Sequence, residues 1–205
     1  LAVRILCASR KDNLPIGHAE QEGFMNEFLH TKKLNGVIAP IRSVGVGGDA
    51  RSYKNPLIVW GPLFSFTKLE NISTYITNHF PVLNRVCLML APQKITRITA
   101  HAGYLLQKRI KLAQKLDNIV MEFAKKHRID SDVWQFPTVL VPLSINDDPR
   151  DAVVLRPICS DEAMTAHFYK MNQALLKELT KLLAPHVSAV LYDITNKPPG
   201  TIEWE

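Results

Sequence analysis

Hydrophobic and polar positions along this 205-residue chain follow two patterns, one typical of helices and one typical of buried strands. Apolar residues recur every three or four positions in four stretches, which predicts helices over residues 20–29, 69–80, 104–128 and 171–185. Short runs rich in valine, isoleucine and leucine predict strands within residues 1–8, 36–47, 56–66, 84–92, 138–145, 151–158 and 187–194.

The order of these elements repeats. "VIAPI" (37–41) matches "VLVPL" (139–143), and "FPVLNRVCLM" (80–89) matches "APHVSAVLYD" (184–193). The repetition predicts two tandem α-β-β-α-β units, a first subdomain over 1–95 and a second over 96–205. Each unit would be a small mixed sheet with helices on one face, which is an α+β fold. We expect the two units to pack about a pseudo-two-fold axis.

Composition places the chain among ordinary globular proteins, with 46% hydrophobic and 21% charged residues. The net charge of +6 favours anionic partners. No apolar run is long enough for a membrane span, so no membrane contact is expected. The three cysteines, Cys7, Cys87 and Cys159, form neither a metal-binding nor a disulfide pattern, which indicates a reducing, cytoplasmic setting.

The stretch "RSVGVGGDARSY" (42–53) is a candidate anion site. Glycines let backbone N–H groups approach an anion, and arginine binds phosphate or carboxylate bidentately. The alternative is a glycine-rich turn between two strands, with Arg42 and Arg51 solvated. No Gly-Lys-Ser/Thr follows, so the stretch is not a P-loop.

The last ten residues, "NKPPGTIEWE", form a second candidate site. Lys197 and Thr201 can donate to a phosphate, and Glu203 can accept from a ribose or a base. The two prolines predict an extended, rigid segment. The alternative is a strand extension with Trp204 in the core.

The remaining candidates are weaker. The helix at 108–128 carries cations opposite its apolar stripe, which predicts a solvated face: Lys108, Arg109, Lys111, Lys115, Lys125, Lys126 and Arg128. The histidines form no ligand pair at helical spacing. No nucleophile elbow, Cys–His signature or carboxylate pair is present, so we predict no catalytic and no metal-binding residue.

Three segments together carry a resemblance to a known family: "RSVGVGGDARSY", "SDEAMTA" (160–166) and the terminal "KPPGTIEWE". The chain resembles the C-terminal, dimerisation and XMP-binding portion of glutamine-hydrolysing GMP synthase, in its long, two-subdomain form. The resemblance implies a ligase of purine and GMP biosynthesis that converts XMP, ATP and glutamine to GMP through adenylated XMP, with magnesium. The amidotransferase triad and ATP-pyrophosphatase loop of the family lie upstream of these residues. We therefore expect a fragment that is inactive alone and binds no cofactor itself.

The resemblance also implies a substrate site. XMP would contact Asp49, Arg51, Gln135, Lys197, Thr201, Ile202 and Glu203, with Lys197 and Thr201 at the phosphate. Partners would be XMP and the ATP-pyrophosphatase and glutaminase domains of the same enzyme, with self-association of the chain open and without nucleic acid. One position departs from the family: Ala189 stands where an arginine is usual, whereas the first unit keeps Arg85. Arg156 or Arg51 would compensate, or the affinity for XMP would be lower.

Two other interpretations stay open from the sequence. "GVGG" (45–48) within an α-β-β-α-β unit is similar to the GXXG loop of a KH-like RNA-binding module. Against it, Asp49 follows the loop and would repel a phosphate, and the terminal motif is left unexplained. The third interpretation is a purely structural dimerisation module.

Overall fold

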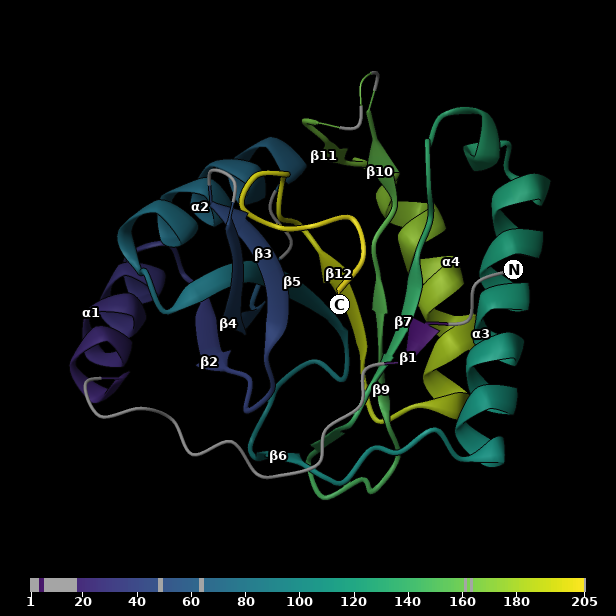
Figure 1. Cartoon of the computed structure of the whole chain (residues 1–205), viewed down its shortest axis with the longest axis horizontal. Helices are drawn as coiled ribbons and strands as arrows, with labels where there is room; N and C mark the ends of the chain where they lie inside the picture. The colour runs from purple at the N-terminus through teal and green to yellow at the C-terminus, as the bar shows by residue number, and fades with distance from the viewer. Residues whose placement is uncertain are drawn as a thin grey trace.

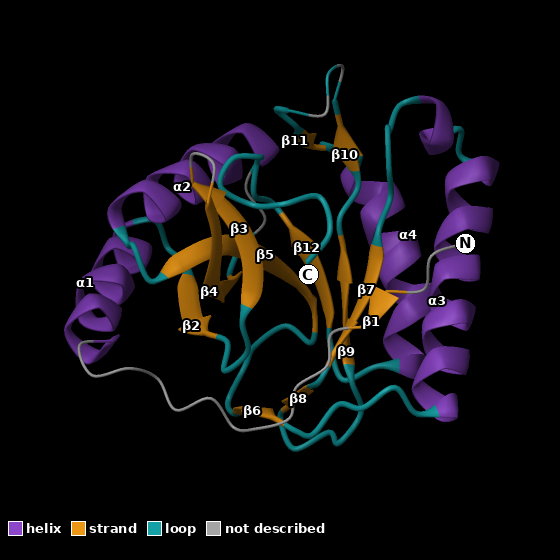
Figure 2. Ribbon diagram, in the orientation of Figure 1, coloured by secondary structure: helices purple, strands orange, loops and turns teal. Residues whose placement is uncertain are grey.

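The computed structural model describes residues 4–5, 18–47, 50–62, 65–160, 162 and 164–204, with side chains from residue 23 onward. Figure 2 shows the helices flanking the strands. The described helices are α1 (His18–Thr31), α2 (Phe66–His79), α3 (Gln107–Lys126) and α4 (Gln173–Leu183), with short 3₁₀ helices at Ile129–Ser131 and Ala184–His186. None of these helices is both long enough and apolar enough to cross a membrane.

The main sheet has the strand order β1-β7-β9-β12-β5-β4-β2, and β3 pairs with β4 beside it. Its strands are β1 (Arg4–Ile5), β2 (Asn35–Ile38), β3 (Ser43–Gly47), β4 (Ala50–Trp60), β5 (Leu83–Ala91), β7 (Thr138–Val141), β9 (Ala152–Leu155) and β12 (Val190–Asp193). Two small antiparallel pairs lie apart from it: β6 (Ile98–Ala100) with β8 (Leu143–Ile145), and β10 (Ile158–Cys159) with β11 (His167–Phe168).

The two halves of the sheet have the same pairing. In the first half β2 is antiparallel to β4 and β4 is parallel to β5; in the second β7 is antiparallel to β9 and β9 is parallel to β12. Val37 lies opposite Ile58 as Val139 lies opposite Val154, which reproduces the alignment of "VIAPI" with "VLVPL". The α+β prediction is confirmed. The two small mixed sheets are the halves of one continuous sheet.

The antiparallel pair β5–β12 joins these halves. Leu88 lies opposite Tyr192, and these two residues occupy equivalent positions in the two units. A pseudo-two-fold axis therefore passes through this pair, perpendicular to the sheet.

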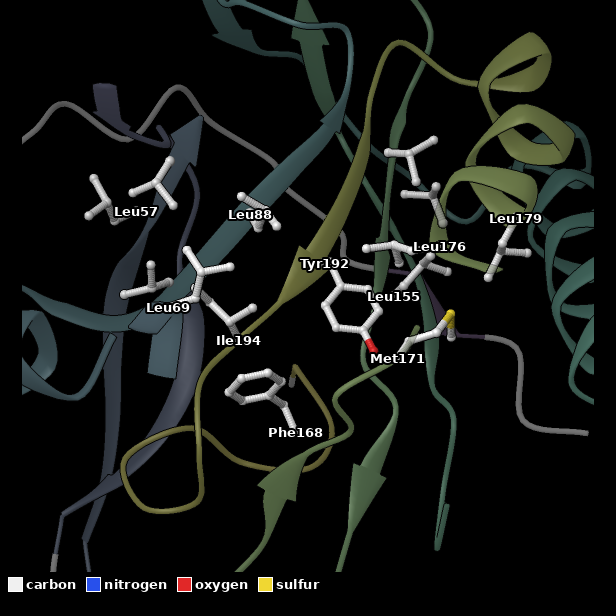
Figure 3. Packing of buried hydrophobic residues seen from close by; sticks show 14 of the residues in the cluster. Leu57, Leu69, Leu88, Leu155, Phe168, Met171, Leu176, Leu179, Tyr192 and Ile194 are labelled. Atoms are coloured by element: carbon white, nitrogen blue, oxygen red, sulfur yellow. The ribbon is translucent and has the colours of Figure 1, made fainter. Parts of the chain in front are cut away.

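The two faces of the sheet are covered differently. Because side chains alternate along a strand, Leu57 and Val59 point into the large core beneath the four helices, and Ile58 points into a second core on the other face. Figure 3 shows the helical face, with Leu176 and Leu179 of α4 near the β-strand side chains. The second core is closed by β6, β8 and the C-terminal Trp204. The predicted placement of the helices on one face is confirmed.

Some elements differ from the pattern. The run 56–66 is the end of β4 and the start of α2, separated by the connection 61–65. The strand predicted at 138–145 is two strands, β7 and β8, because Pro142 interrupts the pairing. The β10–β11 hairpin was not predicted, since its two-residue strands are too short to show a period.

Arg109 is an exception to the predicted solvated face of α3. Its guanidinium is buried, and Nε and Nη2 each donate to the Asp151 carboxylate at 3.0 Å. His101 Nε2 lies 3.1 Å from the same carboxylate. Buried charges in proteins are paired, and the partner of Arg109 is 42 residues away, where helix periodicity cannot reveal it. The lysines of this helix are exposed, as predicted.

Candidate functional site

The C-terminal segment 196–204 (the tail) crosses between β3 and the β10–β11 hairpin (Figure 1, yellow). On one side, Val46 N–H donates to the Pro199 carbonyl at 2.7 Å, and Val44 N–H donates to the Trp204 carbonyl at 3.0 Å. On the other side, Lys197 exchanges backbone hydrogen bonds with Ala166. The tail is therefore fixed along most of its length by the body of the protein.

The sequence predicted an extended Pro198–Pro199 segment, and the structure shows a turn instead. Lys197 pairs with the hairpin and Gly200 pairs with Gly45 of β3, so the chain must reverse between them. Gly200 N–H donates to the Asn196 carbonyl at 3.1 Å and closes this turn.

Two glycines allow the tail to lie this close. A Cβ on Gly45 would lie 2.7 Å from the Pro199 carbonyl oxygen, which is a clash with backbone. A Cβ on Gly200 would lie 3.2 Å from the guanidinium nitrogens of both Arg85 and Arg156. Gly45 of "VGVGG" and Gly200 of "PPGT" thus allow the contact between two segments far apart in sequence.

A buried charge cluster lies beneath the tail. The Asp193 carboxylate at the end of β12 accepts from Arg85 Nη1 at 2.9 Å and from Trp204 Nε1 at 2.9 Å, and lies 2.8 Å from Arg156 Nη1. The side chains of Asp193, Arg85 and Arg156 are all 0% exposed. The Arg85 guanidinium also lies over the Trp204 ring, 5.0 Å from its centre.

The cluster keeps its charges. Burial would raise the pKa of Asp193, but Arg156, Arg85 and the hydrogen bonds from Thr195 outweigh burial and hold this pKa below its ordinary value. Burial and the nearby charge of Arg156 lower the pKa of Arg85 to about 10, which leaves it protonated at neutral pH. The cluster is thus one carboxylate between two cations.

The two arginines use their other donors on the tail itself. Arg85 Nη2 donates to the carbonyls of Thr201 at 3.1 Å and Glu203 at 2.8 Å, and to the Thr201 hydroxyl at 2.6 Å. Arg156 Nε donates to the carbonyls of Thr201 at 2.9 Å and Ile202 at 3.1 Å. Arg85 comes from the first unit and Arg156 from the second, so both units determine the position of Thr201–Glu203.

The structure brings most of the predicted site residues to this tail. Ile202 packs with Ile158 and Ala166, whose backbones pair with Gln135 and Lys197 respectively. This small cluster connects the predicted positions Gln135, Lys197 and Ile202.

The other predicted site residues lie on the side of the tail that faces β3, except for one that is outside the described residues. Arg51 is exposed on β4 opposite Val46, the β3 residue that bonds Pro199. The Thr201 hydroxyl donates a hydrogen bond to the Val44 carbonyl at 2.9 Å, and Glu203 is exposed. Asp49 lies outside the described residues.

The comparisons with known proteins agree with this picture. Residues 122–204 match the family model described as the GMP synthase C terminal domain. A probable glutamine-hydrolysing GMP synthase of Leptospira interrogans (serovar copenhageni) is 34% identical over 210 residues, which cover all of this chain and 34% of the relative. The chain belongs to the GMP synthase family. It spans about a third of the length of the relatives that it matches throughout.

Other GMP synthases match half of the chain. Those of Symbiobacterium thermophilum and Bradyrhizobium diazoefficiens are each 37% identical over 112 residues, which cover 50% of this chain and 22% and 20% of the relatives. The family model falls within residues 96–205.

Two features of this GMP synthase portion bear on the sequence predictions. Ala189 is buried in the core on the face of the sheet opposite the helices. Arg156, one of the two residues expected to compensate for the missing arginine, is fully buried and committed to Asp193 and the tail. The role of Arg85 and Asp193 beneath the tail was not predicted, because their pairing joins positions 108 residues apart.

The "GVGG" stretch gives no support to a KH-like interpretation. Gly45 is buried in β3 and pairs with Ser52 of β4, so it is not part of an exposed loop that could clamp a nucleic-acid backbone. The comparisons reported above give it no support either.

Proposed function

We propose that this chain supplies the XMP contacts of a GMP synthase that converts XMP, ATP and glutamine to GMP. The observation that carries the proposal is the tail, whose segment Thr201–Glu203 is held by two buried arginines from the two units. An anionic nucleotide needs donors on a stiff backbone, and this tail is rigidly supported. XMP would contact Lys197, Thr201, Ile202 and Glu203, together with Gln135, Arg51 and Asp49 around them.

The other parts of the reaction would come from outside this chain. Among the described residues, no group of three or more His, Cys, Asp or Glu side chains could hold a metal ion. We assign ATP, magnesium and the glutaminase chemistry to the ATP-pyrophosphatase and glutaminase domains of the whole enzyme, which would be the partners of this chain in the cytoplasm. The units 1–95 and 96–205 would act as subdomains.

Arg85 would replace the family arginine that is missing at Ala189. It occupies the equivalent position of the first unit and reaches across the β5–β12 pair to Asp193 and the tail. In this proposal Arg85 and Arg156 position the tail, while Lys197 and Thr201 meet the phosphate.

Calorimetric titration of the chain with XMP tests the site. We expect saturable binding, and Lys197→Ala should weaken it at least about tenfold, because a charge-assisted contact worth about 1.5–3 kcal/mol is lost. Lys111→Ala, an exposed lysine of α3, is the matched control and should bind XMP like the unchanged chain. If Lys197→Ala binds XMP with unchanged affinity, the tail is a structural element only.

The chain alone should form no GMP. XMP, ATP, magnesium and ammonia incubated with it should give no GMP above the protein-free background, since adenylation of XMP requires the ATP-pyrophosphatase domain, which we place outside this chain. Chromatographic detection of GMP is the measurement. GMP formation above background would contradict the proposal that the ATP-dependent step takes place in another domain.

A further inference from the structure

A cavity of about 920 Å³ lies between the C-terminal ends of β4 and β5 and the helix α4. Its apolar lining comes chiefly from the strands and from the inner side of α4: Leu88, Leu90, Ala91, Pro92, Leu176 and Ala184. This volume is in the range typical of ligand sites in proteins, roughly 300–1,000 Å³. None of the positions assigned to XMP lines the cavity.

The pseudo-two-fold axis relates this cavity to a region that is filled in the other half. The helices α2 and α4 are equivalent, and their buried apolar residues have the same spacing: Leu69, Ile72 and Ile76 match Leu176, Leu179 and Leu183. Glu70 of α2 therefore corresponds to Lys177 of α4.

In the filled region, the β10–β11 hairpin inserts an aromatic ring and a cation. Phe168 lies 5.8 Å from the ring of Phe66, and Figure 3 shows it beside Ile194 and Tyr192. Lys170 Nζ lies 2.7 Å from the Glu70 carboxylate. We call this region the filled seat and the cavity the open seat. The filled seat holds an apolar ring together with a positive charge that complements Glu70 of the helix.

The cavity stays open because the first unit has no such insertion. The connection from β9 to α4 runs over 156–172 and contains the hairpin, whereas the connection from β4 to α2 is only 61–65. A segment that short cannot form a hairpin and return.

The charge at the open seat is reversed. Lys94, Lys177 and Lys181 line the cavity, and no carboxylate does among the described residues. Lys177 and Lys181 are four residues apart on one helix, where like charges repel. An anion in the cavity would relieve this repulsion. The amides of Asn35, Gln93 and Gln173 add groups that can both donate and accept hydrogen bonds.

We propose that this cavity binds a small anionic ligand that carries an apolar ring, of the nucleoside phosphate class. The ring takes the place that Phe168 has in the equivalent seat, and the phosphate lies at the three lysines. The amides meet the polar edge of the base. This site is separate from the XMP site proposed above and does not depend on it.

The test follows backbone amide NMR shifts of the whole chain during titration with ATP and with GMP. We expect saturable shifts in residues 88–94 and 173–184. Lys177→Glu should weaken binding at least about tenfold, because it restores at this seat the charge that Glu70 has at the filled one. The substitution places a glutamate four residues before Lys181, which favours the helix, so the fold is retained. Lys111→Glu on α3 makes the same charge change away from the cavity and should bind normally.

Two further probes separate the parts of the ligand. Inorganic phosphate and adenosine should each bind at least about tenfold more weakly than ATP, because each lacks one of the two contacts. Lys197→Ala should leave the shifts at 88–94 and 173–184 unchanged, whatever it does to XMP. The proposal is overturned if nucleotides shift only the tail and β3, if Lys177→Glu binds as well as the unchanged chain, or if phosphate alone binds equally well.

Discussion

Asp193→Ala should lower the free energy of unfolding by about 3–5 kcal/mol, the size expected when one partner of a buried ion pair is removed. Asp193 is the only carboxylate that pairs with Arg85 and Arg156 among the described ion pairs, and all three side chains are 0% exposed. Without it, two guanidinium groups remain buried without a counter-charge, and Trp204 Nε1 loses its acceptor. Urea denaturation followed by far-ultraviolet circular dichroism measures the difference.

The cluster already has more hydrogen-bond donors than acceptors, which increases the expected loss of stability when Asp193 is removed. Arg85 Nε and Arg156 Nη2 are buried without a hydrogen-bond partner among the described atoms. Arg97→Ala is the control, since Arg97 pairs with Asp147 at 3.0 Å with both side chains largely exposed, at 67% and 72%. Exposed pairs contribute about 0–1 kcal/mol. If Asp193→Ala costs no more than Arg97→Ala, the cluster does not stabilise the fold.

The contribution of Asp193 should also depend on pH in a defined direction. Its pKa in the folded protein lies below the ordinary value, so the folded state favours the charged carboxylate. The stabilisation is complete above the unfolded pKa of about 3.9 and is lost as the pH falls through the folded pKa. The difference between the unchanged chain and Asp193→Ala should therefore be constant near neutral pH and decrease only in acid.

The fold could be predicted largely because its information is local. The helices were visible as 3.6-residue periods and the strands of the main sheet as short apolar runs. The matching of "VIAPI" with "VLVPL" marked the duplication that the registers of Val37 and Val139 reproduce. The sequence did not predict that the two sheets join. They join through the β5–β12 pair, in which Leu88 lies opposite Tyr192, and the apolar run of each strand is the same whether or not the two strands pair. Short elements such as β10 carry too few residues to show a period.

The candidate site was also predicted only in part. The residue types of the tail identified it as a candidate site, and the structure places Lys197, Ile202 and Gln135 around one small cluster. The residues that hold the tail could not be derived, because Arg85 and Arg156 look like ordinary strand arginines until Asp193 is placed between them. Long-range ion pairs are set by topology, which a periodic pattern does not contain.

Separating the chain after Pro92 should leave neither half stable alone. The sheet is continuous across the β5–β12 pair, so the piece Leu1–Pro92 would expose the edge of β5 and the piece Lys94–Glu205 would expose the edge of β12. Unpaired strand edges template association with other chains. The cut also separates Arg85 from Asp193 and β3 from the tail. Each half has fewer than about 115 residues, and small domains bury a lower fraction of their surface.

We expect each piece to associate or aggregate by itself and the mixture to form a one-to-one complex. The complex should restore the pseudo-two-fold contact, as two copies of a single unit would in an isologous dimer. The intact chain already contains both partners of this contact and should sediment as a monomer at micromolar concentration. Sedimentation velocity of the two pieces, their mixture and the intact chain is the measurement, with the mixture of the first piece and an Asp193→Ala second piece as control. That control should form less complex, because Arg85 would be buried at the contact without its carboxylate. Two soluble monomeric halves without affinity for each other would show that the units are independent domains, and that the shared sheet does not stabilise them.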